Sequence, residues 1–315
     1  MKNFAFTGVG GFIAPRHLKA IRDTGNRLLA AVDPKDSVGV LDQYGFDVRF
    51  FTEIERFDRY LEKLRRGPAE GRIDYLTVCS PNYLHDAHCR LGLRMDANVI
   101  CEKPLVINPW NLDALEELES EGAGRIWTIL QLRAHEKLIE LREKLNAPGA
   151  SRSGKHDVVL TYVTSRGPWY DVSWKGQTEK SGGIPTNIGI HFFDMLMWMF
   201  GKPEGERIHL NEPRRMSGFL ELERARVKWF LSVDNRDVPA QLRPAKTTFR
   251  SITVDGTEVE FSDGFTDLHT RVYEMTLAGK GFGIKDARPS IELVREMRNA
   301  PVSGGSGDLH PLLQR

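Results

Sequence analysis

Residues 3–14 read NFAFTGVGGFIA, and this stretch decides the fold. A β-like run at residues 3–7 leads into a glycine-rich loop, and apolar residues at helical spacing follow the loop. A second β-like run at residues 28–32 ends in Asp33. The order strand, glycine loop, helix, strand and acid predicts the first unit of a parallel, doubly wound α/β sheet.

The glycine loop has the composition of a dinucleotide-binding turn. Glycines let the backbone approach a pyrophosphate, and the N–H groups at the start of the next helix point at it. In G-x-G-x-x-G counted from Gly8, Ile13 takes the third glycine's place. The shifted pattern Gly8-x-x-Gly11-x-x-Ala14 fits close packing of the helix better. A lone glycine loop is often a plain turn, but its position between two strands favours the dinucleotide interpretation.

Asp33 stands where such folds hold an acid at the end of the second strand. Its carboxylate would accept hydrogen bonds from the ribose hydroxyls of adenosine, and it would repel a 2′-phosphate. The expected cofactor is therefore NAD and not NADP.

Strands alternate with helices up to about residue 133, which predicts a parallel sheet. The later strands are expected at residues 49–51, 75–78, 98–101 and 125–130. After residues 75–78, Ser80 and Asn82 can bond a cofactor ribose or cap the next helix. His85 follows about one turn into that helix, where it faces either solvent or the crevice.

The tetrad Cys101-Glu102-Lys103-Pro104 closes the strand at residues 98–101. Open α/β sheets bind ligands at the carboxyl ends of their strands, so Lys103 is placed to meet a molecule held there. Pro104 stiffens the turn behind it. The alternative is an ordinary turn with a solvated lysine.

The pattern changes near residue 134, where β-rich runs replace the alternation. Asp255-Gly256 joins two of these runs and is a strong hairpin signal. We therefore predict a Rossmann domain at residues 1–133 with a doubly wound parallel sheet. Residues 134–315 are predicted to form an α+β domain with a large, mostly antiparallel, open-faced sheet. The tail from residue 303 is expected to be mobile or to contact a partner.

Two stretches of the second half combine residues suited to a ligand. Residues 164–176 contain arginine, lysine, tyrosine and tryptophans in a predicted loop, which suits a flat ring carrying negative charge. The alternative is that the tryptophans pack on the sheet. In the second stretch, Asn187, His191 and Asp194 fall on one face of a predicted apolar helix. Polar groups in such a place need partners or a cavity.

The bulk composition excludes several classes of function. With 315 residues and a net charge of +1, the chain gives no reason to expect nucleic acid or an anionic membrane as partner. Cys79, Cys89 and Cys101 show neither metal-ligand spacing nor a disulfide framework. They suit a reducing cytoplasm, and we expect no metal. The N-terminus runs directly into a strand, so no signal peptide is expected.

Taken together, these motifs resemble the glucose-fructose oxidoreductase / inositol dehydrogenase / rhizopine-catabolism (Gfo/Idh/MocA) family of NAD(P)-dependent sugar oxidoreductases. The resemblance implies that Lys103 and His191 are catalytic and flank the nicotinamide and the reacting sugar carbon. The family's usual aspartate one turn before the histidine is Asn187 here, which removes a carboxylate from any proton relay.

A narrower resemblance is to the UDP-N-acetylglucosaminuronate dehydrogenases. It rests on the IAPRH run at residues 13–17, the loop at residues 164–176 and the NIGIHFFD run at residues 187–194. It implies a bacterial enzyme that oxidises the sugar 3″-hydroxyl to a ketone for the 2,3-diamino-uronic acids of lipopolysaccharide O-antigen. It also implies tight NAD binding and a homotetramer built through the second-domain sheets.

The expected site residues form two sets. Those expected to bind NAD are Gly8, Gly10, Gly11, Phe12, Ile13, Asp33, Ser80, Asn82, His85, Glu102, Lys103 and Gln131. Those expected to bind the substrate are Lys103, Arg166, Tyr170, Trp174, Lys175, Asn187 and His191. His191 is expected to act as general base while Lys103 stabilises the developing alkoxide, with the opposite assignment open.

Three other readings stay open from the residues. The substrate can be a free sugar or polyol such as inositol. The protein can be a catalytically silent NAD-binding regulator, since one fold hosts unrelated functions. It can also be a structural oligomer with a vestigial cofactor cleft.

Overall fold

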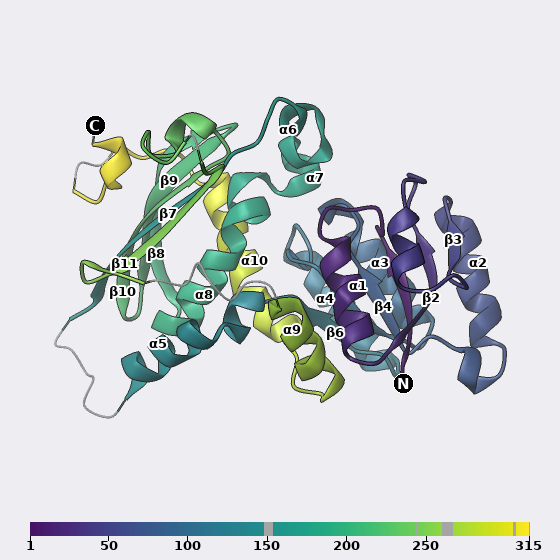
Figure 1. Cartoon of the computed structure of the whole chain (residues 1–315). Helices are drawn as coiled ribbons and strands as arrows, with labels where there is room; N and C mark the ends of the chain where they lie inside the picture. The colour runs from purple at the N-terminus through teal and green to yellow at the C-terminus, as the bar shows by residue number, and fades with distance from the viewer. Residues whose placement is uncertain (148–153, 244, 260–266, 305–306, 315) are drawn as a thin grey trace. The chain divides into compact units, whose positions relative to one another are not determined.

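The computed structural model describes residues 1–147, 154–243, 245–259, 267–304 and 307–314 (Figure 1). The chain packs into two units. The first comprises Met1–Gln131 and Thr266–Arg288, and the second comprises Leu132–Phe265 and Pro289–Arg315. The predicted functional boundary between residues 133 and 134 stays a prediction. The packing also shows one feature that was not predicted from the sequence. The chain returns late to the first unit, where α9 packs against α1.

The first unit is built on a six-stranded parallel sheet in the order β3-β2-β1-β4-β5-β6, which confirms the predicted Rossmann architecture. Its strands are β1 Asn3–Thr7, β2 Arg27–Val32, β3 Arg49–Phe51, β4 Tyr75–Val78, β5 Asn98–Cys101 and β6 Ile126–Thr128. The strand order reverses between β1 and β4. The carboxyl ends of these two strands are therefore where a ligand is expected.

The helices of the first unit bury apolar side chains. In α2, for example, Phe57 and Leu61 are buried one turn apart while the charged residues stay outside. The helices are α1 Ala14–Asp23, α2 Ile54–Arg65, α3 His85–Arg94, α4 Trp110–Glu121 and α9 Leu268–Leu277. A further helix, α10 Ile284–Asn299, begins in this unit and continues into the second.

The second unit contains a six-stranded mixed sheet in the order β12-β11-β7-β10-β9-β8, in which only β7 and β10 pair in parallel. The mostly antiparallel prediction is thus confirmed. The strands are β7 His156–Thr164, β8 Pro203–Glu212, β9 Arg215–Leu222, β10 Ala225–Ser232, β11 Thr248–Val254 and β12 Thr257–Glu258. Asp255 and Gly256 both have positive φ in the β11–β12 turn, as the hairpin signal requires.

The edge strand β8 was not predicted. It reads PEGERIHLNE, and only Ile208 in it is buried, so it lacks the apolar alternation that marks a strand. It forms because β9 offers a full ladder of partners. Of the β-rich run expected after Asp255-Gly256, Thr257–Glu258 form β12, and residues 260–261 lie outside the described part of the chain.

Helices α5 Glu136–Asn146, α6 Trp169–Val172, α7 Thr178–Ser181 and α8 Ile190–Phe200 complete the second unit. Residues 309–314 of the tail pack on the second unit, while a contact of the tail with a partner stays a prediction. His310 is buried, stacks on Phe230 and lies 3.0 Å from the Thr161 hydroxyl. Leu312 and Leu313 pack on the same apolar cluster, so burial of these side chains orders the tail. Among the described residues, no helix is long and apolar enough to span a membrane.

Candidate active site

The glycine loop brings the carboxyl ends of β1 and β4 into contact. Gly8 has φ +79°, and a Cβ there would lie 2.6 Å from the backbone carbon and oxygen of Cys79. Its N–H donates to the carbonyl of Val32 on β2 at 2.8 Å. Only glycine fits this position, because both the left-handed backbone and the close approach exclude a side chain.

Asp33 lies beside this loop. Its Oδ2 accepts a hydrogen bond from the Gly10 N–H at 3.0 Å, and its Oδ1 accepts one from the Lys35 N–H at 2.9 Å. The loop therefore holds the carboxylate at the carboxyl edge of the sheet, where the NAD prediction needs it. Phe12 stands out from the loop with 92% of its surface exposed, and Ile13 is the N-cap residue of α1.

After β4, the Ser80 hydroxyl pairs with a side chain of the next helix. The Ser80 hydroxyl lies 2.8 Å from His88 Nδ1, and α3 begins at His85 with no side-chain cap. His85 faces neither solvent nor an open crevice, since it is buried. Its Nδ1 lies 2.7 Å from the carbonyl oxygen of Pro104, and its Nε2 lies 2.8 Å from that of Ser80. Burial lowers the pKa of His85, and the hydrogen bonds to these two carbonyls oppose that shift.

Glu102 and Lys103 differ in exposure at the end of β5. Glu102 is buried, and its Oε1 lies 2.9 Å from His17 Nε2 and 3.1 Å from His269 Nε2. Lys103 follows and is half-buried. His17 and His269 were absent from the predicted site. The IAPRH run that contains His17 was a signal, but nothing in the sequence linked it to His269.

Gln131 is the last residue of the first segment of the first unit. Its Oε1 is buried and has no hydrogen-bond partner among the described residues. An unpaired buried acceptor is costly in a folded protein, so a donor from a bound molecule would stabilise it. The glycine loop, Asp33 and this acceptor are together compatible with a bound dinucleotide.

In the second unit, the structure brings Tyr170 and Asn187 together. Tyr170, on α6, is 2% exposed, and its hydroxyl accepts a hydrogen bond from Asn187 Nδ2 at 3.2 Å. Burial raises the pKa of Tyr170, so the hydroxyl keeps its proton at neutral pH.

The rest of the predicted substrate loop folds into short helical turns. The Lys175 ammonium lies 4.3 Å from the centre of the Trp174 ring, a cation–π contact. Arg166 donates to the carbonyl of Ser165. Arg214, which the sequence did not single out, donates to both carboxylate oxygens of Asp171 at 2.8 Å and to the carbonyl of Arg166. The loop is therefore braced at both ends of α6.

His191 is the second residue of α8. The expectation of a single α-helical stripe through Asn187, His191 and Asp194 is wrong, because Pro185–Gly189 form a π-helix before α8 begins. Such wide turns are frequent at functional sites. Asp194 is bound by Arg133 in bidentate fashion, with donor–acceptor distances of 2.9 and 2.7 Å. The half-buried Asn187 and the buried Asp194 thus both have hydrogen-bond partners.

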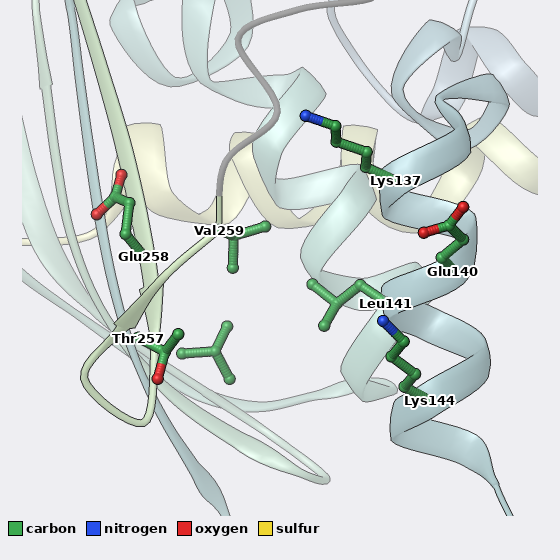
Figure 2. A pocket seen from close by; sticks show the side chains of 8 residues that line it. Lys137, Glu140, Leu141, Lys144, Thr257, Glu258 and Val259 are labelled. Atoms are coloured by element: carbon green, nitrogen blue, oxygen red, sulfur yellow. The ribbon is translucent and has the colours of Figure 1, made fainter.

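An open depression of about 430 Å³ lies elsewhere in the second unit, between α5 and the β11–β12 hairpin. Figure 2 shows Lys137, Glu140, Leu141 and Lys144 of α5 on one side and Thr257 to Val259 on the other. None of the predicted site residues lines it. Lys103 belongs to the first unit and His191 to the second, so their convergence on one substrate stays a prediction.

Comparison with known proteins shows the family. The model of the Gfo/Idh/MocA oxidoreductase family's NAD-binding Rossmann fold matches residues 2–128, and that of its C-terminal alpha/beta domain matches residues 156–299. Inositol 2-dehydrogenase of Rhizobium meliloti (strain 1021) is 25% identical over 202 residues, which cover 63% of this chain and 55% of that protein. The chain therefore spans about half the length of the first such curated relative.

Two solved structures of the WlbA (WbpB) dehydrogenase from Thermus thermophilus are much more similar. One, in complex with NAD and α-ketoglutarate, is 51% identical with a TM-score of 0.93. The other, in complex with NAD and UDP-GlcNAcA, is 50% identical with a TM-score of 0.93. Each alignment covers 99% of this chain and 100% of the other. With the parallel sheet, the glycine loop and both family domains in place, this chain belongs to the Gfo/Idh/MocA oxidoreductase family.

Proposed function

We propose that this protein oxidises the 3″-hydroxyl of UDP-N-acetyl-2-amino-2-deoxy-D-glucuronate to the 3-keto sugar with NAD as oxidant. The observation that carries the proposal is the full-length, 50% identical structure that holds NAD and UDP-GlcNAcA. The family fold and the residues Lys103 and His191 support it.

When NAD is bound, it supplies the acceptor for the hydride that leaves the sugar carbon. The hydroxyl proton must go elsewhere as the C=O bond forms. His191 takes that proton as general base, since an imidazole normally titrates near neutral pH. Lys103 donates a hydrogen bond to the same oxygen and stabilises the charge that develops on it. The reverse assignment, with a neutral Lys103 as base, is the alternative within this mechanism.

The remaining predicted residues hold the substrate. Asn187 and the Tyr170 hydroxyl, already joined by a hydrogen bond, offer a neutral pair that can orient the sugar. Arg166 and Lys175 supply positive charge for the uronate or the diphosphate. Trp174 presents an aromatic face beside Lys175, which suits a flat ring. The hydrogen bond from Gly10 fixes the Asp33 carboxylate that favours NAD over NADP.

The cofactor must be reoxidised before a second turnover. The structure of the Thermus thermophilus protein with NAD and α-ketoglutarate suggests a 2-oxo acid as hydride acceptor. The acid's ketone carbon would accept the hydride and its oxygen a proton, which yields a 2-hydroxy acid and NAD. Adding α-ketoglutarate to the purified protein after NADH has formed should remove the NADH absorbance.

The biological setting of the proposal follows from the resemblance. The product would feed 2,3-diamino-uronic acid units of O-antigen, in the cytoplasm, from a homotetramer built through the second-unit sheets. Sedimentation of the purified protein tests the tetramer.

The decisive experiment compares wild type with Lys103→Ala and His191→Asn. NADH formation is followed with the UDP-sugar, and retention of NAD is checked by absorbance. Both variants should keep NAD and lose turnover. Near-wild-type turnover in both variants would contradict the assignment.

Removing UDP from the substrate separates the proposal from oxidation of a free sugar or polyol. The proposed enzyme should be inactive on the free sugar. A wild-type protein that binds NAD but oxidises none of the nucleotide sugars or polyols would be the silent regulator instead.

A further inference from the structure

The backbone around Lys103 is held on both sides by buried side chains. The Lys103 N–H donates to Oε2 of Glu102 at 3.1 Å. The carbonyl oxygen of the next residue, Pro104, lies 2.7 Å from His85 Nδ1. Glu102 and His85 are both buried. The main chain that carries Lys103 is therefore fixed through a donor and an acceptor.

Glu102 is in turn fixed by two histidines from distant parts of the sequence. Its Oε1 receives His17 Nε2 at 2.9 Å and His269 Nε2 at 3.1 Å. His17 lies on α1, the helix that follows the glycine loop, and His269 lies on α9. Three elements of the first unit thus meet at one carboxylate oxygen.

The proton positions in this group can be assigned from its chemistry. Burial raises the pKa of Glu102, but the hydrogen bonds from His17 and His269 outweigh it and hold that pKa well below its usual value. Burial lowers the pKa of His17. An ionised carboxylate accepts only, so His17 and His269 both donate to it through Nε2–H.

The other nitrogen of His17 continues the chain of hydrogen bonds. His17 Nδ1 lies 2.9 Å from the Tyr273 hydroxyl, which lies 3.0 Å from Thr77 Oγ1. Burial raises the pKa of Tyr273 well above its usual value, so its hydroxyl has a proton to give to Nδ1. Thr77 then donates to the tyrosine oxygen. Donation from Thr77 through Tyr273 and His17 thus ends at the Glu102 carboxylate, which also accepts from the Lys103 N–H.

Two histidines and a carboxylate are also a ligand set for zinc. Ligand atoms in a tetrahedral zinc site stand about 3.3 Å apart, given bonds of about 2.0 Å. The separations of 2.9 and 3.1 Å here are those of hydrogen bonds.

We propose that Glu102, His17 and His269 form a positioning group that sets the main chain of Lys103 relative to the glycine-loop helix. This inference rests on the proposed function, which gives Lys103 its role on the substrate oxygen. The side chains of all three residues are buried, and they meet at Oε1 of Glu102. It acts by keeping the Lys103 backbone from shifting, and misplacement of a reacting group by about 1 Å can cost about 100-fold in rate.

The test compares two substitutions at His269. His269→Leu removes the N–H donor, whereas His269→Gln can keep an N–H near the position of Nε2. We expect kcat with the UDP-sugar to fall about 10- to 100-fold in His269→Leu and to recover largely in His269→Gln. KM should change little, because the substrate contacts are untouched.

Asn3→Ala is the matched control. Asn3 is buried in the same unit and donates to the carbonyls of Glu70 and Arg72, at the opposite end of β1 from the glycine loop. It should lower the melting temperature and leave kcat unchanged. If His269→Leu behaves like this control, the group is only structural and the inference is overturned.

Two further arms keep the inference testable. If His269→Leu does not fold, Glu102→Gln serves instead, because one amide oxygen cannot accept from three N–H groups and kcat should again fall. If wild type itself forms no keto sugar, the proposed function fails, and crystal structures of the His269 variants decide the positioning. A displaced Lys103 main chain in His269→Leu but not in His269→Gln supports the inference, and an unmoved one in both overturns it.

Discussion

Removing one partner of the ion pair between Arg133 and Asp194 should destabilise the second unit more than removing one partner of an exposed pair. The Arg133 side chain is 12% exposed and the Asp194 side chain 3%. The guanidinium donates through Nε and Nη2 to the two carboxylate oxygens at 2.9 and 2.7 Å. Removal of one partner from such a pair leaves the other charge buried without compensation.

Asp194→Asn keeps the volume of the side chain and removes its charge. We expect it to lower the free energy of unfolding by about 3 kcal/mol, the lower end of what breaking a buried pair costs. The double substitution Arg133→Met with Asp194→Leu should cost less than Asp194→Asn alone, because no unpaired charge remains. Urea unfolding of the second unit, followed by tryptophan fluorescence, measures both.

Arg226 and Asp157 provide the control. They form a 3.3 Å pair whose side chains are 51% and 69% exposed, so Asp157→Asn should cost less than about 1 kcal/mol. If Asp194→Asn and Asp157→Asn lower the free energy of unfolding by the same amount, the argument that burial sets the cost of breaking the pair is refuted. Because Asp194 lies on α8 with His191, kcat should be measured on the same preparations.

Three further predictions follow from single positions. Gly8→Ala should abolish NAD retention or folding, because its Cβ would lie 2.6 Å from backbone atoms; NAD absorbance and circular dichroism test this, and normal NAD content would contradict it. Burial holds the pKa of His310 at about 4, below its ordinary 6.5, so its neutral form stabilises the fold above pH 6.5 and that contribution is lost as the pH falls towards 4. His310→Gln can still bond Thr161, and it should reduce the fall in melting temperature between pH 6.5 and pH 4. An unchanged slope would contradict this contribution of His310. Arg214→Met should free Asp171 and loosen the predicted substrate loop, so KM for the UDP-sugar should rise several-fold while kcat changes less; an unchanged KM would show that the brace is not needed.

Local patterns in the sequence predicted the elements that are set by local chemistry. The glycine loop could be predicted from the sequence because Gly8 must adopt positive φ and must lie against the end of β4, and no other residue type does both. The β11–β12 turn could be predicted because Asp255 and Gly256 are residue types that tolerate the positive φ found there. These signals depend on one or two residues and their neighbours in the chain.

Features that depend on distant partners were not predictable in this way. Strand β8 was missed because its stability comes from pairing with β9 and not from its own alternation. The π-helix at Pro185–Gly189 was missed because the spacing of the polar residues was interpreted with the α-helical period of 3.6 residues per turn. In the structure Gly189 packs closely on β10, and a Cβ there would lie 2.6 Å from the Leu231 side chain. Packing against β10 therefore sets the local geometry there.

The partners of Glu102 illustrate the same limit at the site. His17 and His269 are 85 and 167 residues away from it in sequence, and each alone looks like an ordinary core histidine. Only the fold brings α1, β5 and α9 to one oxygen. The tetrad at residues 101–104 predicted where Lys103 lies, but not what holds it.

The departure at Asn187 acquires a physical consequence from the second unit. An amide cannot carry a proton, and this one donates to the Tyr170 hydroxyl. The nearest carboxylate in the predicted stripe, Asp194, has both oxygens engaged by Arg133. Protonation of Asp194 would remove the charge that its ion pair with Arg133 requires. If His191 is the base, we therefore expect its proton to leave by a route that avoids Asn187 and Asp194.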